Sequence, residues 1–292
     1  MEHDDHLILL TRLALWPLAV LSAIFGPMLF LFPNRTDTLW AWQIRPDMSA
    51  VFVGAGYIFG ACAITTLLLR NQWHALNTAA VATWVFSTAM LAATLLHLDR
   101  FFVGTLRFYV WFVIYLALPF ALPVAWWFNR RYTRPRSPGD LVFEPPIRYG
   151  LLIFGLVVLA FGLFLFFDPP GAAAIWPWQL TPLMSRVIGG WIMFLGVGGI
   201  VIFFEPRYTA YRALIPSTIV WDVALLIGSL LHLADFDFTR TSAWVWFIIL
   251  VLFTLGNIGA ARKDRPQRRH PDNHLVFRLT HPTDTQLATR DM

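Results

Sequence analysis

Eight long apolar runs alternate with short polar stretches along the chain. A membrane-spanning helix needs about 20 consecutive and mostly apolar residues, and the runs meet or approach that length. The polar stretches are short, so consecutive helices are expected to be antiparallel. The pattern predicts an all-α integral membrane protein with eight transmembrane helices, over residues 13–32, 49–69, 76–97, 107–128, 148–167, 186–204, 213–234 and 243–261.

A tryptophan-rich stretch occurs twice, each time between the first and second helix of a group of four. The segment 40–49 matches the segment 176–185 at its Trp, Gln, Pro, Met and Ser positions, with a constant offset of 136 residues. Farther along, the segment 95–98 matches 230–233 at an offset of 135 residues. Hydrophobicity alone would not align Trp, Gln, Pro and His in the same order. We therefore expect an internal duplication.

Each copy holds four predicted helices, which is an even number. Both copies then enter the membrane from the same side, so they are parallel repeats with a pseudo-two-fold axis along the membrane normal. We expect a first four-helix unit over residues 1–131, a basic and Pro-rich linker over 132–146, and a second unit over 147–265. Residues 266–292 are polar without a sustained apolar period, which is typical of a disordered tail.

Composition and charge place the chain in a membrane and orient it. Hydrophobic residues make up 58% and charged residues 13%, about half the charged fraction of a soluble domain. The net charge is +5, yet most basic residues fall on the side of the termini, as expected of cytoplasmic flanks. This distribution argues against a nucleic-acid partner and predicts cytoplasmic termini. The short loops and the acidic start, which is not a signal peptide, favour a bacterial plasma membrane. The tryptophan-rich stretches would lie outside, with their rings in the headgroup region.

A matched set of polar residues lies in the third helix of each copy, at spacings that keep each set on one helical face. Such a face is expected to meet protein or a water-filled cavity rather than lipid. These are the candidate binding residues: Thr83, Ser87, Thr94 and His97 in the first copy, and Thr218, Asp222, Ser229 and His232 in the second.

Asp222 is the strongest candidate of this set for a functional role, because a carboxylate near the middle of a membrane is a candidate for binding a proton, a cation or a substrate amine. The alternative is a neutral carboxyl group that bonds Thr218 or a neighbouring helix. His97 and His232 admit three interpretations. They could bond loop atoms at the interface, relay protons with nearby aspartates, or ligate a haem, one histidine from each copy.

Glycine and proline add expectations about packing. Gly56 and Gly60 form a small-xxx-small pattern, and glycines also crowd the equivalent helix of the second copy, which lets helices approach closely. Pro119 and Pro123 are expected to kink the fourth helix, whereas the equivalent Thr254 and Ile258 would not.

No nucleotide-binding loop, zinc-protease motif or nucleophile elbow is present, and the single cysteine, Cys62, excludes an intrachain disulfide. We expect no enzyme. The leading hypothesis is a protein that binds or moves a small solute or lipid between its two repeats. A haem-binding or redox protein and a scaffold or assembly subunit are the alternatives. The sequence does not fix the cofactor or the oligomeric state.

In the second copy the loop before a Gly-rich second helix lies at Met184–Trp191, and the third helix ends in Leu231, His232 and Leu233. In these features the chain resembles bacterial DoxX-like membrane proteins, which are built from four-helix units. The resemblance could cover both copies, and it implies fold and membrane location more than an activity.

Overall fold

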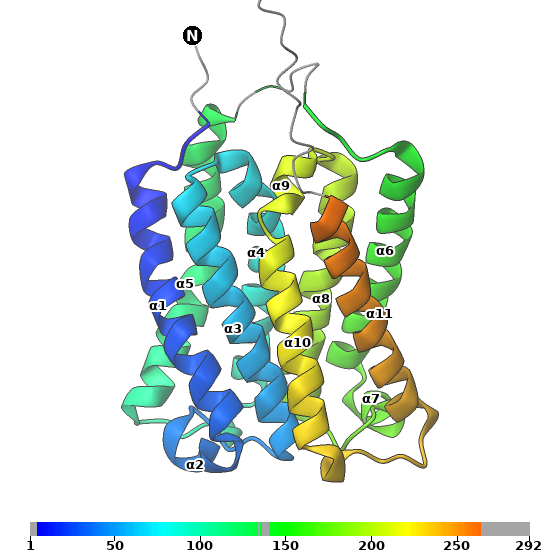
Figure 1. Cartoon of the computed structure of the whole chain (residues 1–292). Helices are drawn as coiled ribbons and strands as arrows, with labels where there is room; N and C mark the ends of the chain where they lie inside the picture. The colour runs from blue at the N-terminus through cyan, green and yellow to red at the C-terminus, as the bar shows by residue number, and fades with distance from the viewer. Residues whose placement is uncertain (1–4, 134, 136–139, 264–292) are drawn as a thin grey trace, which may run out of the picture.

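The computed structural model describes residues 5–133, 135 and 140–263, so the predicted disordered tail lies outside the described residues. In this part of the chain the structure is helical and contains no strand, which confirms an all-α protein (Figure 1). The long helices are α1 (Leu9–Leu31), α3 (Asp47–Arg70), α4 (Trp73–Leu96), α5 (Leu106–Asn129), α6 (Pro145–Phe167), α8 (Pro182–Phe204), α10 (Ile215–Leu231) and α11 (Thr241–Lys263). Short helices connect them: α2 (Thr36–Leu39), α7 (Pro169–Ile175), α9 (Tyr208–Arg212) and four 3-10 turns.

Seven of the long helices in the described residues are long and apolar enough to cross a membrane. The other one, α10, is apolar but has only 17 residues, which gives a length of roughly 26 Å. It is shorter than the predicted 213–234 because Pro216 occupies its first turn and the helix breaks at His232. Proline is well tolerated in the first turn of a helix, where its missing N–H has no partner to lose. The apolar helices therefore confirm the prediction of a multi-pass membrane protein.

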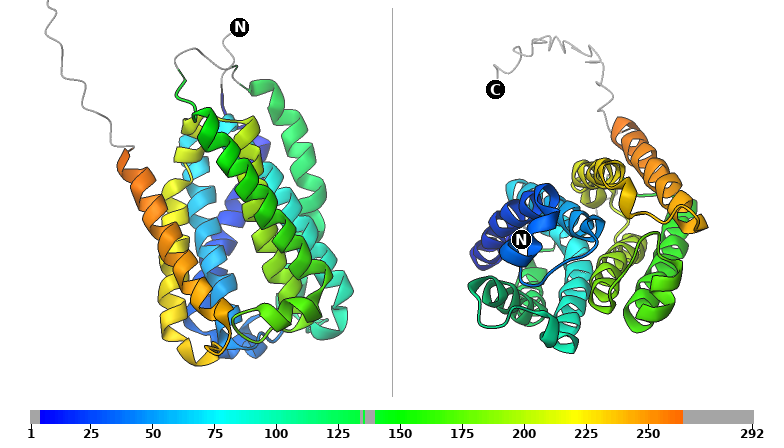
Figure 2. Two further views of the ribbon diagram at one scale, coloured as in Figure 1. Left: turned by 90° about the vertical axis from the view of Figure 1, so that its right-hand side faces the viewer. Right: turned by 90° about the horizontal axis from the view of Figure 1, so that it is seen from below.

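The eight long helices form four antiparallel pairs. α1 packs on α3, α4 on α5, α6 on α8, and α10 on α11. The first half of the chain then meets the second where α3 lies against α10 and α4 lies against α8, and Figure 2 shows the two halves side by side. α3 and α8 are the most enclosed, with 61% and 56% of their apolar windows buried, against 28% or less for α1, α5, α6 and α11.

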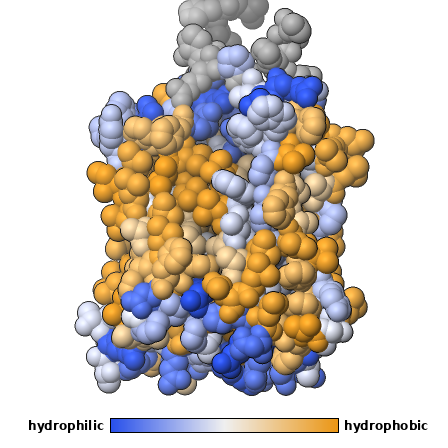
Figure 3. All heavy atoms as spheres, turned by 180° about the vertical axis from the view of Figure 1, so that it is seen from behind, coloured by the Kyte–Doolittle hydropathy of each residue, from blue (hydrophilic) through white to orange (hydrophobic). Residues whose placement is uncertain are grey.

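Two faces of the molecule can be told apart. We call the face that carries the start of α1, the start of α6 and the end of α11 the terminal face. The opposite face carries α2, α7 and the tryptophan-rich stretches, and we call it the tryptophan face (Figure 1). Between them runs an apolar belt, seen in Figure 3 with hydrophilic residues gathered at its two ends. This distribution fits a protein embedded in a bilayer.

Glycine allows the closest helix contacts. A Cβ atom at Gly54 of α3 would lie 2.7 Å from the backbone nitrogen of Phe30 in α1. A Cβ atom at Gly196 of α8 would lie 2.5 Å from the backbone nitrogen of Leu159 in α6. Gly56 faces the indole of Trp191 across the contact between the two halves. The expectation that the glycines serve close packing is confirmed at Gly56 and Gly196 but not at Gly60, where a Cβ atom would make only ordinary contacts, or at Gly198, where it would make none.

The expectation that the tryptophan side chains are solvent-exposed anchors in the headgroup region is wrong. Trp40, Trp42, Trp176 and Trp178 are each 3% exposed or less. Their loops fold back over the helix ends, because the Phe102 N–H donates to Ala41 at 2.9 Å and the Asp237 N–H donates to Pro177 at 2.9 Å. The indoles therefore fill the protein interior, where aromatic rings contribute the largest buried area.

Equivalent residues of the two halves make equivalent contacts. Trp111 Nε1 donates to Thr94 Oγ1 at 2.9 Å, and Trp246 Nε1 donates to Ser229 Oγ at 2.9 Å. Trp42 pairs with Phe101 in an isolated bridge, and Trp178 pairs with Phe236 in the same way. The related positions keep the offsets seen in the sequence, 135 residues for the first set and 136 or 135 for the second.

The glycine contacts give a direct test of the packing. Gly196→Ala should lower the free energy of unfolding by about 1–3 kcal/mol, because its Cβ would meet backbone that cannot move independently. Gly198→Ala is the matched control, since nothing lies within 4 Å of a Cβ there. Thermal melting in detergent should show a drop of several degrees for the first variant only. Equal melting temperatures for both variants would contradict this packing.

Candidate functional site

The polar residues of α4 satisfy much of their hydrogen bonding within their own helix. Thr83 donates to the carbonyl of Ala79, Ser87 to that of Trp84 and Thr94 to that of Met90, at 2.9, 3.0 and 2.8 Å. Ser87 and Thr94 are buried, at 0% and 1% exposure. Back-bonding of this kind lets a hydroxyl group sit in a membrane helix at little cost.

The polar residues of α10 mostly tie that helix to α11. Thr218 donates to the carbonyl of Ile215 at 2.8 Å, and Ser229 accepts the indole N–H of Trp246. Asp222 accepts a hydrogen bond from Asn257 Nδ2 of α11 at 2.7 Å, and Asn257 Oδ1 in turn accepts one from the Tyr211 hydroxyl at 3.3 Å. Asp222 thus has its bonded partner inside the second half of the chain, on the neighbouring helix.

The two histidines have different surroundings. His97 Nε2 lies 2.7 Å from a guanidinium nitrogen of Arg186 on α8. A guanidinium can only donate, so His97 accepts through Nε2 and is neutral in this contact. Burial, together with the charge of Arg186, lowers the pKa of His97 below its usual value. His232 Nδ1 instead lies 4.0 Å from Asp235. Axial haem ligation by His97 through Nε2 would require Arg186 to move away.

A further polar cluster, which the sequence reasoning missed, lies at the terminal face. His74 on α4 bonds Asp5 through Nδ1 and lies 3.1 Å from Thr209 Oγ1 through Nε2. Burial raises the pKa of Asp5. The hydrogen bonds from His74 and the charges of His74 and Arg207 outweigh this effect, so the pKa of Asp5 lies below its usual value. The cluster joins residues from the two halves of the chain, so we interpret it as a structural tie.

A cavity of about 180 Å³ lies among the helices of the first half of the chain. Its walls come from α1, α3, α4 and α5, and Trp191 and Phe194 of α8 close it on the side of the second half. The lining is almost entirely apolar. The indole N–H groups of Trp73, Trp111 and Trp126, which line it, already donate to Thr133, Thr94 and Asn77. We call this space the inner cavity.

Two tyrosine hydroxyl groups bond each other at the wall of the inner cavity, which three serine or threonine residues also line. Tyr57 Oη and Tyr115 Oη lie 2.8 Å apart, and both residues are buried. One hydroxyl donates to the other, so the acceptor keeps an O–H that can donate to a third group. The equivalent positions in the second half are Met193 and Leu250. Comparing the two copies position by position would have pointed to this pair, because a polar residue stands there in one copy only.

Proline and small residues help to make room for the inner cavity. Gly60, Ala63 and Ala79 line it where larger side chains would fill it. α5 continues through Pro119 and Pro123 from Leu106 to Asn129. Pro123 has no N–H to give to the carbonyl of Pro119 one turn earlier, and Trp84 Nε1 donates to that carbonyl at 2.9 Å. A side chain of α4 thus satisfies the backbone group that the proline releases.

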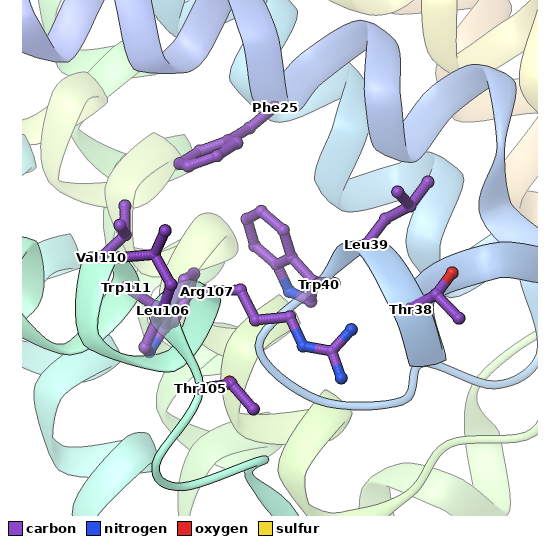
Figure 4. A pocket seen from close by; sticks show the side chains of 9 residues that line it. All are labelled: Phe25, Thr38, Leu39, Trp40, Thr105, Leu106, Arg107, Val110 and Trp111. Carbon is purple, nitrogen blue, oxygen red and sulfur yellow. The ribbon is translucent and has the colours of Figure 1, made fainter.

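A second and more open pocket of about 480 Å³ lies at the tryptophan face (Figure 4). Phe25, Trp40, Trp111 and Arg107 stand around it, with Leu39 and Val110 completing the apolar wall. We call it the outer pocket. Phe25 and Trp111 line the outer pocket and the inner cavity alike, so the two spaces adjoin at these two rings.

Comparison of the chain with protein-family models, with curated proteins and with solved structures found no match.

The contact between His97 and Arg186 gives a prediction about pH. The folded state lowers the pKa of His97, so the unfolded chain takes up its proton first as pH falls. Stability should therefore decrease as pH drops below about 6.5, the ordinary histidine value, until His97 in the folded protein is also protonated.

Melting temperatures recorded from pH 8 to pH 5 would test this. His97→Gln keeps an acceptor for Arg186 but cannot titrate, so its pH dependence should be flatter than that of the wild type. Arg186→Gln removes one cause of the lowered pKa and should flatten it in part. An unchanged slope in His97→Gln would contradict the assignment.

Proposed function

We propose that the protein crosses the membrane eight times as two parallel four-helix units and binds an apolar, membrane-soluble molecule in the inner cavity. The observation that carries the proposal is the cavity itself, a largely apolar space with one buried hydroxyl pair inside the first unit. The protein acts as a binding protein rather than as an enzyme.

The topology of eight crossings is supported by the position of the chain ends. The start of α1 and the end of α11 lie on the same face (Figure 1), which requires an even number of crossings. Seven helices qualify by length and apolarity, and α10 supplies the eighth, because local bilayer thinning accommodates a short helix at modest cost. The excess of arginine on the terminal face supports a cytoplasmic location for it, in a bacterial plasma membrane.

The two-unit organisation is supported by contacts that recur at equivalent positions. The Thr94–Trp111 and Ser229–Trp246 bonds occupy the same place in each unit. The packing of α3 on α10 and of α4 on α8 pairs the second and third helices of one unit with the third and second of the other. A pseudo-two-fold axis along the membrane normal relates such pairs.

The inner cavity suits an apolar occupant. An engineered apolar cavity of about 150 Å³ binds benzene and stays dry, and the inner cavity is of similar size, about 180 Å³. Interior volume that side chains do not fill costs stability, so an occupant would stabilise the first unit. The free O–H of the Tyr57–Tyr115 pair can donate to one acceptor atom of that occupant, such as a carbonyl oxygen.

Access from the bilayer is the simplest route to this site. α1 and α5 both line the inner cavity but touch each other in only a few places. Both helices expose large apolar side chains on their outer surfaces. A lipid-soluble molecule could therefore enter between α1 and α5 without crossing water.

The site differs in position from the one expected from the sequence, which lay between the repeats. At two places, side chains fill the contact between the units. Trp191 packs over Gly56, and the methyl group of Met90 lies against Gly190. Thr83 is the residue of the predicted polar set that lines the inner cavity.

Gly60→Leu tests the proposal. Gly60 lines the inner cavity, and a Cβ there meets only Ser22 at the ordinary distances of 3.6 and 3.9 Å. A leucine at this position should fold and occupy the cavity. The matched control is Gly198→Leu on α8, where the space is open.

The measurement is mass spectrometry of apolar molecules retained by the purified, partly delipidated full chain. We expect about one retained molecule per chain in the wild type and in Gly198→Leu, and a loss of most of it in Gly60→Leu. Equal retention by all three proteins, or none by any, would overturn the proposal.

A further inference from the structure

We propose that the outer pocket binds the anionic headgroup of a membrane lipid, with Arg107 as its charged partner, and that the lipid's chain continues into the inner cavity. This inference rests on the proposed function and deepens it, because it names the class of ligand. The lipid would be an amphiphile with a phosphate or carboxylate headgroup.

Arg107 is the first reason. Among the described residues it has no ion pair and no hydrogen bond, and its Nε atom is buried without a partner. Its guanidinium carbon lies 4.5 Å from the centroid of the Phe102 ring. Three other arginines of the tryptophan face are ion-paired: Arg45 with Asp47, Arg100 with Asp99 and Arg240 with Asp237, at 2.6, 3.0 and 2.9 Å. Among the described residues Arg35 also has no ion pair, but it is exposed, and Arg186 bonds His97.

The charge of Arg107 stands beside a second positive source. Arg107 is the second residue of α5, and the first turn of a helix carries partial positive charge on its free N–H groups. A partly buried guanidinium without an anion is costly, whereas a guanidinium that meets a phosphate or carboxylate forms paired, charge-assisted bonds. The pocket therefore favours an anion over a neutral or cationic group.

The walls of the outer pocket are the second reason, because they suit a lipid better than a free anion. Figure 4 shows the Arg107 side chain reaching across a space walled by Phe25, Trp40 and Leu39. The indole N–H of Trp40 is buried there without a partner among the described residues. A small hydrated anion would leave most of this apolar wall unused, whereas the upper part of a lipid chain would cover it.

The connection between the spaces is the third reason. Phe25 and Trp111 form a wall common to the outer pocket and the inner cavity. A headgroup at Arg107 lies at the end of the apolar belt, where lipid headgroups reside, and the chain below it points toward the cavity. Such a ligand would use the charge of the one space and the apolar lining of the other.

The second unit lacks an unpaired charge here, because Arg240, which donates to the Trp176 carbonyl, is ion-paired with Asp237. The position equivalent to Arg107 is Ser242, although Trp176 and Trp246 stand where Trp40 and Trp111 do in the first unit. We therefore expect one selective site per chain, in the first unit.

The test is native mass spectrometry of the full chain in detergent, titrated with three probes. These are phosphatidylglycerol, phosphatidylcholine with the same chains, and inorganic phosphate. The wild type should bind phosphatidylglycerol about tenfold or more tightly than phosphatidylcholine, as expected for a charge-assisted bond. Arg107→Gln should lose this preference, and Arg107→Lys should keep part of it. Arg35→Gln, which removes an exposed charge from the same face, is the matched control and should keep it in full.

Three outcomes would overturn the inference. The wild type could bind both lipids equally, Arg107→Gln could retain the preference, or inorganic phosphate could bind as tightly as phosphatidylglycerol, which would indicate a free-anion site. The Gly60→Leu experiment separates this failure from failure of the proposed function. If Gly60→Leu still lowers lipid retention, the cavity is a binding site without headgroup selectivity. A wild type that binds neither lipid would also overturn this inference, whereas an apolar molecule that is retained by the wild type and lost in Gly60→Leu would still support the proposed function.

Discussion

Backbone contact at glycines is the interaction on which the rest of this structure depends. At Gly54 and Gly196 the helices α3 and α8 approach α1 and α6 so closely that a Cβ atom has no room. In a bilayer, where lipid chains are as apolar as the side chains, such close packing holds helices together. α3 and α8 are fixed by these contacts, and each also faces the other half of the molecule. The positions of α4, α5, α10 and α11 follow from them.

The two halves make several contacts at corresponding positions but differ at the residues on which the proposals rest. Tryptophan N–H bonds to α4 and α10 recur at equivalent positions. The differences are concentrated at a few residues. Tyr57 and Tyr115 replace Met193 and Leu250, and Arg107 replaces Ser242. In the second half, Asp222 stands where the first has Ser87, and its bonded partner is Asn257. One half thus holds the inner cavity and, beside it, the outer pocket with Arg107, and the other holds a carboxyl group that bonds a residue of the neighbouring helix.

Much of the fold could be predicted from the sequence, and little of the site. Apolar runs of about 20 residues report spanning helices directly, since the bilayer thickness sets their length. Hydropathy predicts a helix longer than α10 for the seventh run, because it does not register the break at His232. The interfacial enrichment of tryptophan is an average over many proteins, whereas the burial of Trp42 depends on a loop that folds onto Phe101. Helical periodicity gives the face of a polar residue but not its partner, so the bond from Asn257 to Asp222 and that from Arg186 to His97 could not be foreseen. The resemblance to DoxX-like units stays a prediction.

A structure of the full chain in lipid nanodiscs, determined by electron cryomicroscopy, would test the central claim most directly. The account predicts elongated density between α1 and α5 that passes the Tyr57–Tyr115 hydroxyl pair and ends beside Arg107. It also predicts no equivalent density between α6 and α11. An inner cavity that is closed by its own side chains, or that holds only water, would contradict the claim that the first unit is a lipid-binding site.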